Sequence, residues 1–137
     1  MSKAVRFCVV GGGRIGTIHI QNIQRNHRTV VSAFVDVDAA RAKQVQEETG
    51  CATFSSLEEL FNSSVDVDAF VICSPTFTHV EYSKLCISKG KPVLCEKPIS
   101  MDPKEIKELS DYAEAQNVPL LCGKHPTTCI KRECCNN

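Results

Sequence analysis

Features that would direct a chain to a membrane, a nucleic acid or the cell exterior are absent from this sequence. Sixteen lysines and arginines balance sixteen aspartates and glutamates, so no basic field favours nucleic acid or an anionic membrane surface. No apolar run approaches the roughly 20 residues of a membrane-spanning helix. The opening residues 1–10 run directly into glycines and are needed as a strand, which leaves no room for a signal peptide. We therefore expect a cytoplasmic protein.

Paired-cysteine motifs are absent too, although the chain has nine cysteines. No Cys-x-x-Cys occurs, and a cytoplasmic protein keeps its thiols reduced. Cys8, Cys73 and Cys95 fall in or beside apolar runs, where cysteine packs as a small hydrophobic residue. A group of soft ligands ends the chain: Cys122, His125, Cys129, Cys134 and Cys135. Its spacing fits no zinc framework, so we expect no metal site and favour reactive or disordered thiols over a zinc site.

Linkers, repeats and low-complexity tracts are likewise missing, and 137 residues suit one domain. What is present is a regular alternation of strand and helix signals. Strands are expected at 4–10, 30–37, 52–54, 67–73, 92–95 and 118–122, and helices at 15–26, 39–48, 57–61, 78–89 and 103–116. Asp38 and Ser56 are placed as N-caps, with Glu59 positioned for a capping box. Gly50 is placed to end the second helix, and Pro103 to open the last one.

This rhythm predicts an α/β fold, a doubly wound parallel sheet of the Rossmann type with helices on both faces. We expect residues 3–123 to form a single domain of this type. Residues 124–137 have no sustained period, and we expect an irregular, cysteine-rich tail.

Glycines between the first strand and the first helix carry a phosphate-binding pattern. Gly11, Gly13 and Gly16 fill the positions of Gly-x-Gly-x-x-Gly in the strand–turn–helix context that the motif requires. The first permits the turn, the second lets backbone approach a pyrophosphate, and the third lets helix and strand pack closely. The helix N-terminus then offers N–H groups and partial positive charge to the anion. The pattern predicts a dinucleotide site, although glycines also serve ordinary turns.

An acidic residue supports this interpretation. Asp36 follows Gly16 by 20 residues and ends the second strand, where a carboxylate accepts hydrogen bonds from adenosine ribose hydroxyls. It would repel a 2′-phosphate, so NAD is favoured over NADP. Arg41 keeps NADP as an alternative, because a nearby arginine can pair with a phosphate. The competing interpretation is that Asp36 only caps the next helix, a role we assign to Asp38.

Four segments together resemble the Gfo/Idh/MocA family of NAD(P)-dependent oxidoreductases, and more finely its inositol 2-dehydrogenase branch. They lie in the family's order and cover Lys3 to about Gly123. They are Gly11-Gly12-Gly13-Arg14-Ile15-Gly16, Val35-Asp36-Val37-Asp38, Ser74-Pro75-Thr76-Phe77-Thr78-His79 and Cys95-Glu96-Lys97-Pro98.

The resemblance implies roles for the later segments. Ser74, Pro75 and Thr76 would pass beside the nicotinamide ribose, and His79 begins the following helix as a further candidate for cofactor contact. For His79, packing or capping is an equal alternative. His19 and His27 are interpreted as ordinary helix residues.

The family's Glu-Lys-Pro motif maps onto Glu96, Lys97 and Pro98. In this motif the peptide bond before the proline is often cis. Lys97 would bond the substrate oxygen, and Glu96 would position ring and lysine. An ammonium beside a reacting hydroxyl stabilises developing alkoxide, which suits the oxidation of an alcohol. The alternative for Glu96 and Lys97 is a solvated ion pair in a loop.

The likeness stops at Gly123, where the family continues into a second domain that carries the substrate pocket and usually the dimer surface. We expect that domain to be missing here, as in a truncated product. The function predicted is hydride transfer between NAD and a polyol, sugar or cyclic alcohol, with only the cofactor half on this chain. The alternatives are a nucleotide-binding module without turnover, regulatory or inactive, and an NAD(P)-sensing transcriptional co-regulator. This chain can form oligomers, but not through the family's dimer surface, which lies on the missing domain.

Overall fold

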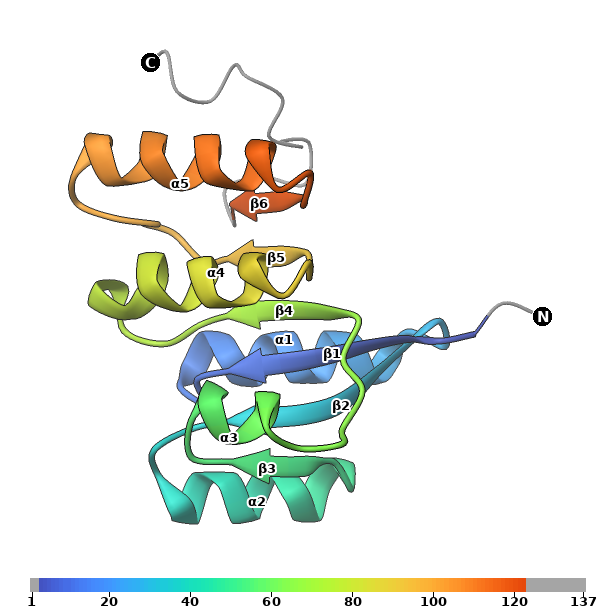
Figure 1. The fold of residues 1–137 in the computed structure, drawn as a ribbon. Coiled ribbons are helices and arrows are strands. Elements are labelled where there is room, and N and C mark those ends of the chain that lie inside the picture. Colours follow the sequence, from blue (N-terminus) through green and yellow to red (C-terminus); the bar gives the residue numbers. More distant parts are fainter. Residues whose placement is uncertain (1–2, 123–137) are drawn as a thin grey trace.

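The computed structural model describes residues 3–122, and these form one layered α/β unit (Figure 1). The strands are β1 (Val5–Val10), β2 (Thr29–Val35), β3 (Ala52–Phe54), β4 (Ala69–Ile72), β5 (Val93–Cys95) and β6 (Leu120–Cys122). The helices are α1 (Arg14–Arg25), α2 (Ala39–Thr49), α3 (Leu57–Phe61), the 3₁₀ turn η1 (Thr76–Thr78), α4 (His79–Ser88) and α5 (Pro103–Ala115). The predicted tail, residues 124–137, lies outside the described residues.

All strand pairs are parallel, in the order β3-β2-β1-β4-β5-β6. The chain runs outward from β1 to β3, then returns to the middle and runs outward again from β4 to β6 (Figure 1). The strand order therefore reverses between β1 and β4, the point at which open α/β sheets bind ligands at their carboxyl edge. The predicted doubly wound Rossmann fold is confirmed.

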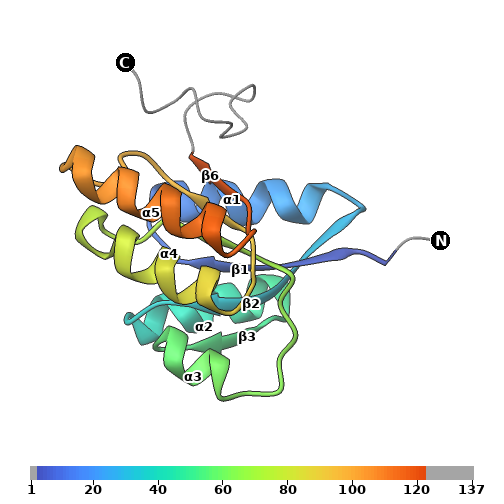
Figure 2. The same ribbon diagram turned by 45° about the horizontal axis from the view of Figure 1, so that its top comes forward.

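Helices cover both faces of the sheet, each over its own apolar cluster. On one face α1 and α2 pack through Ile20, Ile23 and Val45. On the other face α3, α4 and α5 pack on the strands, with α4 and α5 side by side (Figure 2). Two-sided burial explains why the strand sequences are continuously apolar instead of alternating. Among the predicted packing cysteines, Cys8 and Cys95 are fully buried and Cys73 is partly buried.

A bulge in β2 breaks the simple alternation of faces. The register moves from Phe7 opposite Val31 to Cys8 opposite Ala33, so Ser32 is the extra residue. Val31 and Ala33 consequently belong to clusters on opposite faces, although they lie two positions apart. The sequence pattern contains no sign of this bulge.

The helix ends follow local signals closely. Asp38 caps α2 by accepting N–H groups of Ala40 and Arg41, and Gly50 ends that helix with φ of 75°. Pro103 lies at the first position of α5, as predicted. The capping box differs from expectation. Ser56 does accept the N–H of Glu59, but the Glu59 carboxylate bonds Ser55, one residue earlier.

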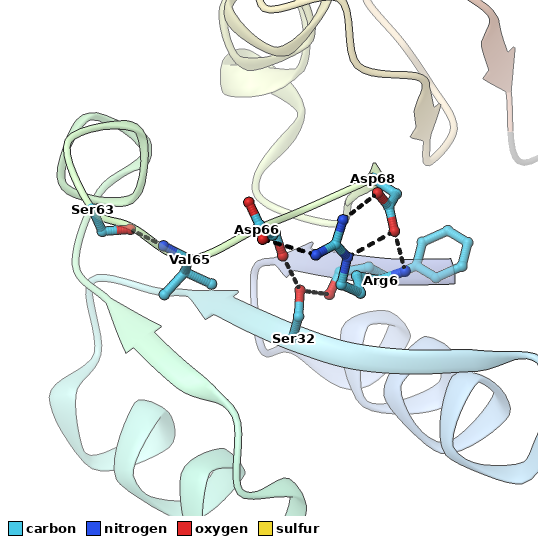
Figure 3. A network of polar contacts seen from close by, with 7 residues as sticks. Arg6, Ser32, Ser63, Val65, Asp66 and Asp68 are labelled. Atoms are coloured by element: carbon cyan, nitrogen blue, oxygen red, sulfur yellow. Dashed lines mark hydrogen bonds and ion pairs between the residues drawn. The ribbon is translucent and has the colours of Figure 1, made fainter. Parts of the chain in front are cut away.

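At the amino-terminal edge, opposite the glycine loop, Arg6 ties β1 to the segment before β4 (Figure 3). Its guanidinium donates to both Asp68 oxygens, at 3.0 and 2.9 Å, and pairs with Asp66 at 2.9 Å. These hydrogen bonds, the main cause, hold the pKa of Asp68 well below its usual range. Ser32 joins the network by donating to the Asp66 carbonyl at 3.0 Å. The network has no part in the carboxyl edge, where the candidate site lies.

Candidate functional site

The first and third glycines of the motif are required by contacts within the protein. Gly11 has φ of 97°, and a Cβ there would lie 2.7 Å from the Ser74 nitrogen. A Cβ on Gly16 would lie 2.0 Å from the Gly11 carbonyl oxygen. Side chains at either position would collide with backbone, so these glycines let the loop, α1 and the β4 loop meet closely.

Gly13 differs, because a Cβ at this position would meet no heavy atom within 4 Å. It is the N-cap of α1, without a side-chain cap, and the first turn contains no acidic residue. The first backbone N–H groups of α1 therefore have no side-chain cap, and the positive end of the helix dipole lies beside the open space at Gly13. Arg14 and Ile15 follow with exposed side chains. This is the space that a close-approaching anion needs.

Asp36 lies beside this loop at the carboxyl end of β2. Its Oδ2 accepts the Gly12 N–H at 2.7 Å, and its Oδ1 accepts the Asp38 N–H at 2.9 Å. Two backbone donors thus fix the orientation of the carboxylate, and each oxygen retains a further lone pair for a ligand hydroxyl. The predicted capping role of Asp38 is confirmed, since Asp38 and not Asp36 caps α2.

Arg41 reaches back from α2 to the same loop. Its Nε donates to the Gly12 carbonyl at 2.8 Å, and Nη2 donates to Thr17 Oγ1 at 2.7 Å. Two of its five N–H donors are therefore used in fastening α2 to the glycine loop and α1. This structural engagement weakens the case for Arg41 as a phosphate ligand.

The β4 loop is built around η1 and braced internally. Ser74 Oγ and Thr78 Oγ1 share a hydrogen bond of 2.7 Å, and Thr78 also donates to the Pro75 carbonyl. Thr76 lies in η1, immediately after Pro75. The three predicted cofactor-contacting residues of this loop thus lie together at the carboxyl edge, next to the glycine loop that Ser74 contacts.

His79 begins α4 and is only 2% exposed. Its Nδ1 lies 2.7 Å from the Pro98 carbonyl oxygen, and its Nε2 lies 2.7 Å from the Ser74 carbonyl oxygen. Each ring nitrogen therefore lies within hydrogen-bond distance of a backbone carbonyl oxygen, and the ring joins two loops. Contact between His79 and a cofactor stays a prediction, and both ring nitrogens already face backbone carbonyl oxygens of the protein.

Glu96, Lys97 and Pro98 follow β5, with a cis peptide before the proline. Glu96 Oε1 lies 2.6 Å from His19 Nε2, and both side chains are mostly buried. The interpretation of His19 as an ordinary helix residue is therefore wrong. Lys97 is exposed, and within residues 3–122 its ammonium forms no hydrogen bond or ion pair. Among the described residues, the segment thus presents an unpaired Lys97 ammonium beside a Glu96 carboxylate that is bonded to His19.

Cys73 lies between these features, at the end of β4. Burial raises the pKa of its thiol to about 12, and the nearby Glu96 charge adds to the effect. The thiol is therefore neutral at physiological pH and a poor nucleophile. Among the described residues no cluster of three metal-ligating side chains occurs. The cysteines and histidine of the tail beyond Cys122 lie outside that range.

The sheet topology therefore gathers the predicted residues at one edge. The loops after β1, β2, β4 and β5 carry the glycine motif, Asp36, Ser74 to Thr76 and the Glu-Lys-Pro segment, respectively. In the part of the chain that the structure describes, no helix is both long and apolar enough to cross a membrane.

Known proteins share this arrangement. Residues 5–124 match the family model described as oxidoreductase family, NAD-binding Rossmann fold. The inositol 2-dehydrogenase of Pseudarthrobacter chlorophenolicus is 41% identical over 104 residues, which cover 74% of this chain and 31% of that protein.

Two solved structures of dehydrogenases have a similar fold. The apo scyllo-inositol dehydrogenase of Lactobacillus casei has a TM-score of 0.82 and 27% identity, covering 88% of this chain and 36% of that one. The WlbA dehydrogenase of Bordetella pertussis, in complex with NADH and UDP-GlcNAcA, has a TM-score of 0.83 and 25% identity. That match covers 89% of this chain and 35% of the other.

The chain thus spans about a third of the length of the relatives it matches. The match to the family model nevertheless covers nearly all of the described residues. A family model that spans the whole sheet, the glycine motif and the Glu-Lys-Pro segment is a specific finding. By that match, the chain belongs to the Gfo/Idh/MocA oxidoreductase family and holds its NAD-binding Rossmann domain.

Proposed function

We propose that this chain binds NAD at the carboxyl edge of the sheet and is the cofactor-binding part of a dehydrogenase for polyols, sugars or cyclic alcohols. The open space at Gly13, in front of an uncapped helix N-terminus, is the observation that carries the proposal. A pyrophosphate can approach that backbone closely, whereas Gly11 and Gly16 already touch protein. Gly13, Arg14, Ile15 and the N–H groups of the first turn would hold it.

Asp36 is proposed to receive the adenosine ribose hydroxyls. Its carboxylate is fixed beside the glycine loop by the N–H groups of Gly12 and Asp38. A 2′-phosphate at that place would face a carboxylate, and Arg41 already has two donors occupied by the protein. These contacts favour NAD over NADP.

Lys97 is proposed as the catalytic residue, with Glu96 holding the segment that carries it. Bound nicotinamide would supply the hydride acceptor. The Lys97 ammonium, which has no partner within residues 3–122, would donate to the substrate oxygen and lower the free energy of the developing alkoxide. Ser74, Pro75 and Thr76 would line the nicotinamide ribose. The polyol or sugar substrate is suggested by the names of relatives such as the inositol 2-dehydrogenase.

A binding module without turnover is the second candidate, because the chain spans only about a third of its relatives. We propose that the chain alone binds NAD weakly and turns over little or no substrate. Calorimetric titration of the full chain with NAD and NADP tests binding, and a myo-inositol turnover assay tests activity. We expect saturable NAD binding tighter than NADP binding. No saturable binding of either dinucleotide would refute the proposal, and normal turnover would refute the binding-module view.

A further inference from the structure

The two residues that flank Lys97 are each bonded to a histidine from a different helix. On one side, His19 of α1 contacts the Glu96 carboxylate at 2.6 Å. On the other side, His79 of α4 contacts the Pro98 carbonyl at 2.7 Å. Lys97 itself has no such contact within residues 3–122. Its neighbours in the chain therefore fix its backbone, and its own side chain does not.

The two histidines approach from opposite faces of the sheet. The helix α1 packs in the cluster with Ile20 and Ile23, whereas α4 packs in the other cluster through Cys86 and Ile87. The Glu96-Lys97-Pro98 segment leaves β5 between these layers. Contacts from both layers restrict movement of the segment toward either face.

Burial makes both contacts costly to lose. The side chains of His19 and Glu96 are 22% and 17% exposed, and His79 is 2% exposed. A carboxylate so far removed from water loses a strong, charge-assisted hydrogen bond if its partner is removed. His79 also bonds the Ser74 carbonyl, so the β4 loop is joined to the same segment.

A lysine side chain has high rotamer entropy, and an exposed one samples many positions. Fixing its backbone removes one large source of that spread, which is how positioned groups become effective in sites of this kind. We propose that His19 and His79 are positioning residues that hold the Glu96-Lys97-Pro98 segment from both faces of the sheet, so that Lys97 remains beside the nicotinamide end of the cofactor. The proposal rests on the proposed function, namely that NAD binds at this edge.

Titration with two ligands distinguishes a positioning role of His19 from a packing role. NADH and ADP-ribose share the adenosine, the pyrophosphate and the second ribose, and only NADH carries the nicotinamide. The full chain is titrated with each ligand by calorimetry, for wild type, His19→Ala, His19→Gln and His27→Ala. His27 is an exposed histidine just beyond α1 and provides a matched control. Thermal melts verify that every variant is folded.

We expect His19→Ala to weaken NADH binding about five- to tenfold. The corresponding loss of binding free energy is a fraction of the free energy that a charge-assisted hydrogen bond contributes. ADP-ribose binding should stay within about twofold, because the glycine loop and Asp36 are untouched. His19→Gln should restore NADH binding, since its amide N–H can donate to Glu96. His27→Ala should match wild type with both ligands. The His19 variants carry the test because replacing the buried His79 would also disturb packing.

Equal weakening of both ligands by His19→Ala would overturn the inference, since that is the result of a packing role. Unchanged NADH affinity, or failure of His19→Gln to restore it, would also overturn it. A wild-type chain that binds ADP-ribose and NADH, with none of these differences between variants, refutes the positioning role alone. A wild-type chain that binds neither ligand refutes the proposed function, and the positioning role falls with it.

Discussion

Two glycines of one motif should respond in opposite ways to the same substitution. Gly13→Ala adds a methyl group that meets no atom within 4 Å, at φ of −69°, which alanine adopts without strain. Alanine is a poorer N-cap by about 0.5–1 kcal/mol, but it lowers the entropy of the unfolded chain by a comparable 0.4–1 kcal/mol. The melting temperature should therefore move by less than about 4 °C.

Dinucleotide affinity should change strongly in the same variant. The added methyl group occupies the space through which an anion approaches the α1 backbone. A hydrogen bond to a charged group contributes about 1.5–3 kcal/mol, so loss of one corresponds to about tenfold or more in the dissociation constant for NAD. Calorimetric titration of Gly13→Ala beside wild type measures this loss.

Gly16→Ala is the contrasting variant. Its Cβ would lie 2.0 Å from the Gly11 carbonyl oxygen, so α1 must move away from β1. Overpacking of this kind costs about 1–3 kcal/mol, which lowers the melting temperature by about 3–12 °C for a domain of this size. Wild-type NAD affinity in Gly13→Ala, or equal melting temperatures for the two variants, would refute the reasoning.

Three further substitutions test separate parts of the fold and site. Asp36→Asn should bring the dissociation constants for NAD and NADP closer by about tenfold, with Asp38→Asn as control; an unchanged ratio contradicts a ribose role for Asp36. Hydrogen bonds from Arg6 lower the pKa of Asp68 in the folded state. The ionised carboxylate therefore stabilises the fold fully above the unfolded-state pKa of about 3.9, and this stabilisation is lost as the pH falls below that value. Asp68→Asn should lower the urea midpoint at pH 7 but progressively less below about pH 4, and a pH-independent difference counts against the ion pair. Asn117 has φ of 54°, so Asn117→Gly should raise the free energy of unfolding by up to about 1 kcal/mol, and a lower melting temperature would contradict this.

Local chemistry explains which parts of the fold could be predicted from the sequence. The Asp38 cap, the Gly50 terminus and the start of α5 at Pro103 depend on residues within one helical turn. The doubly wound parallel sheet was predicted from the alternation of strand and helix signals along the chain. Both kinds of signal are contiguous in the chain.

The missed features depend on contacts between distant segments. His19 meets Glu96 across 77 positions, and no residue near His19 in the chain indicates that partner. The only signal was its place on the helical face that carries Ile15, Ile18 and Ile23. The bulge at Ser32 likewise depends on the pairing with β1. Tertiary structure decides both, and single-sequence patterns do not carry that information.

The outer strands have a bearing on how copies of this domain can associate. Within residues 3–122, both edge strands, β3 and β6, are only three residues long. Short edges expose few unpaired backbone groups, so they are poor templates for a strand from another molecule. A sheet that continues from one copy into the next is therefore disfavoured along this part of the chain.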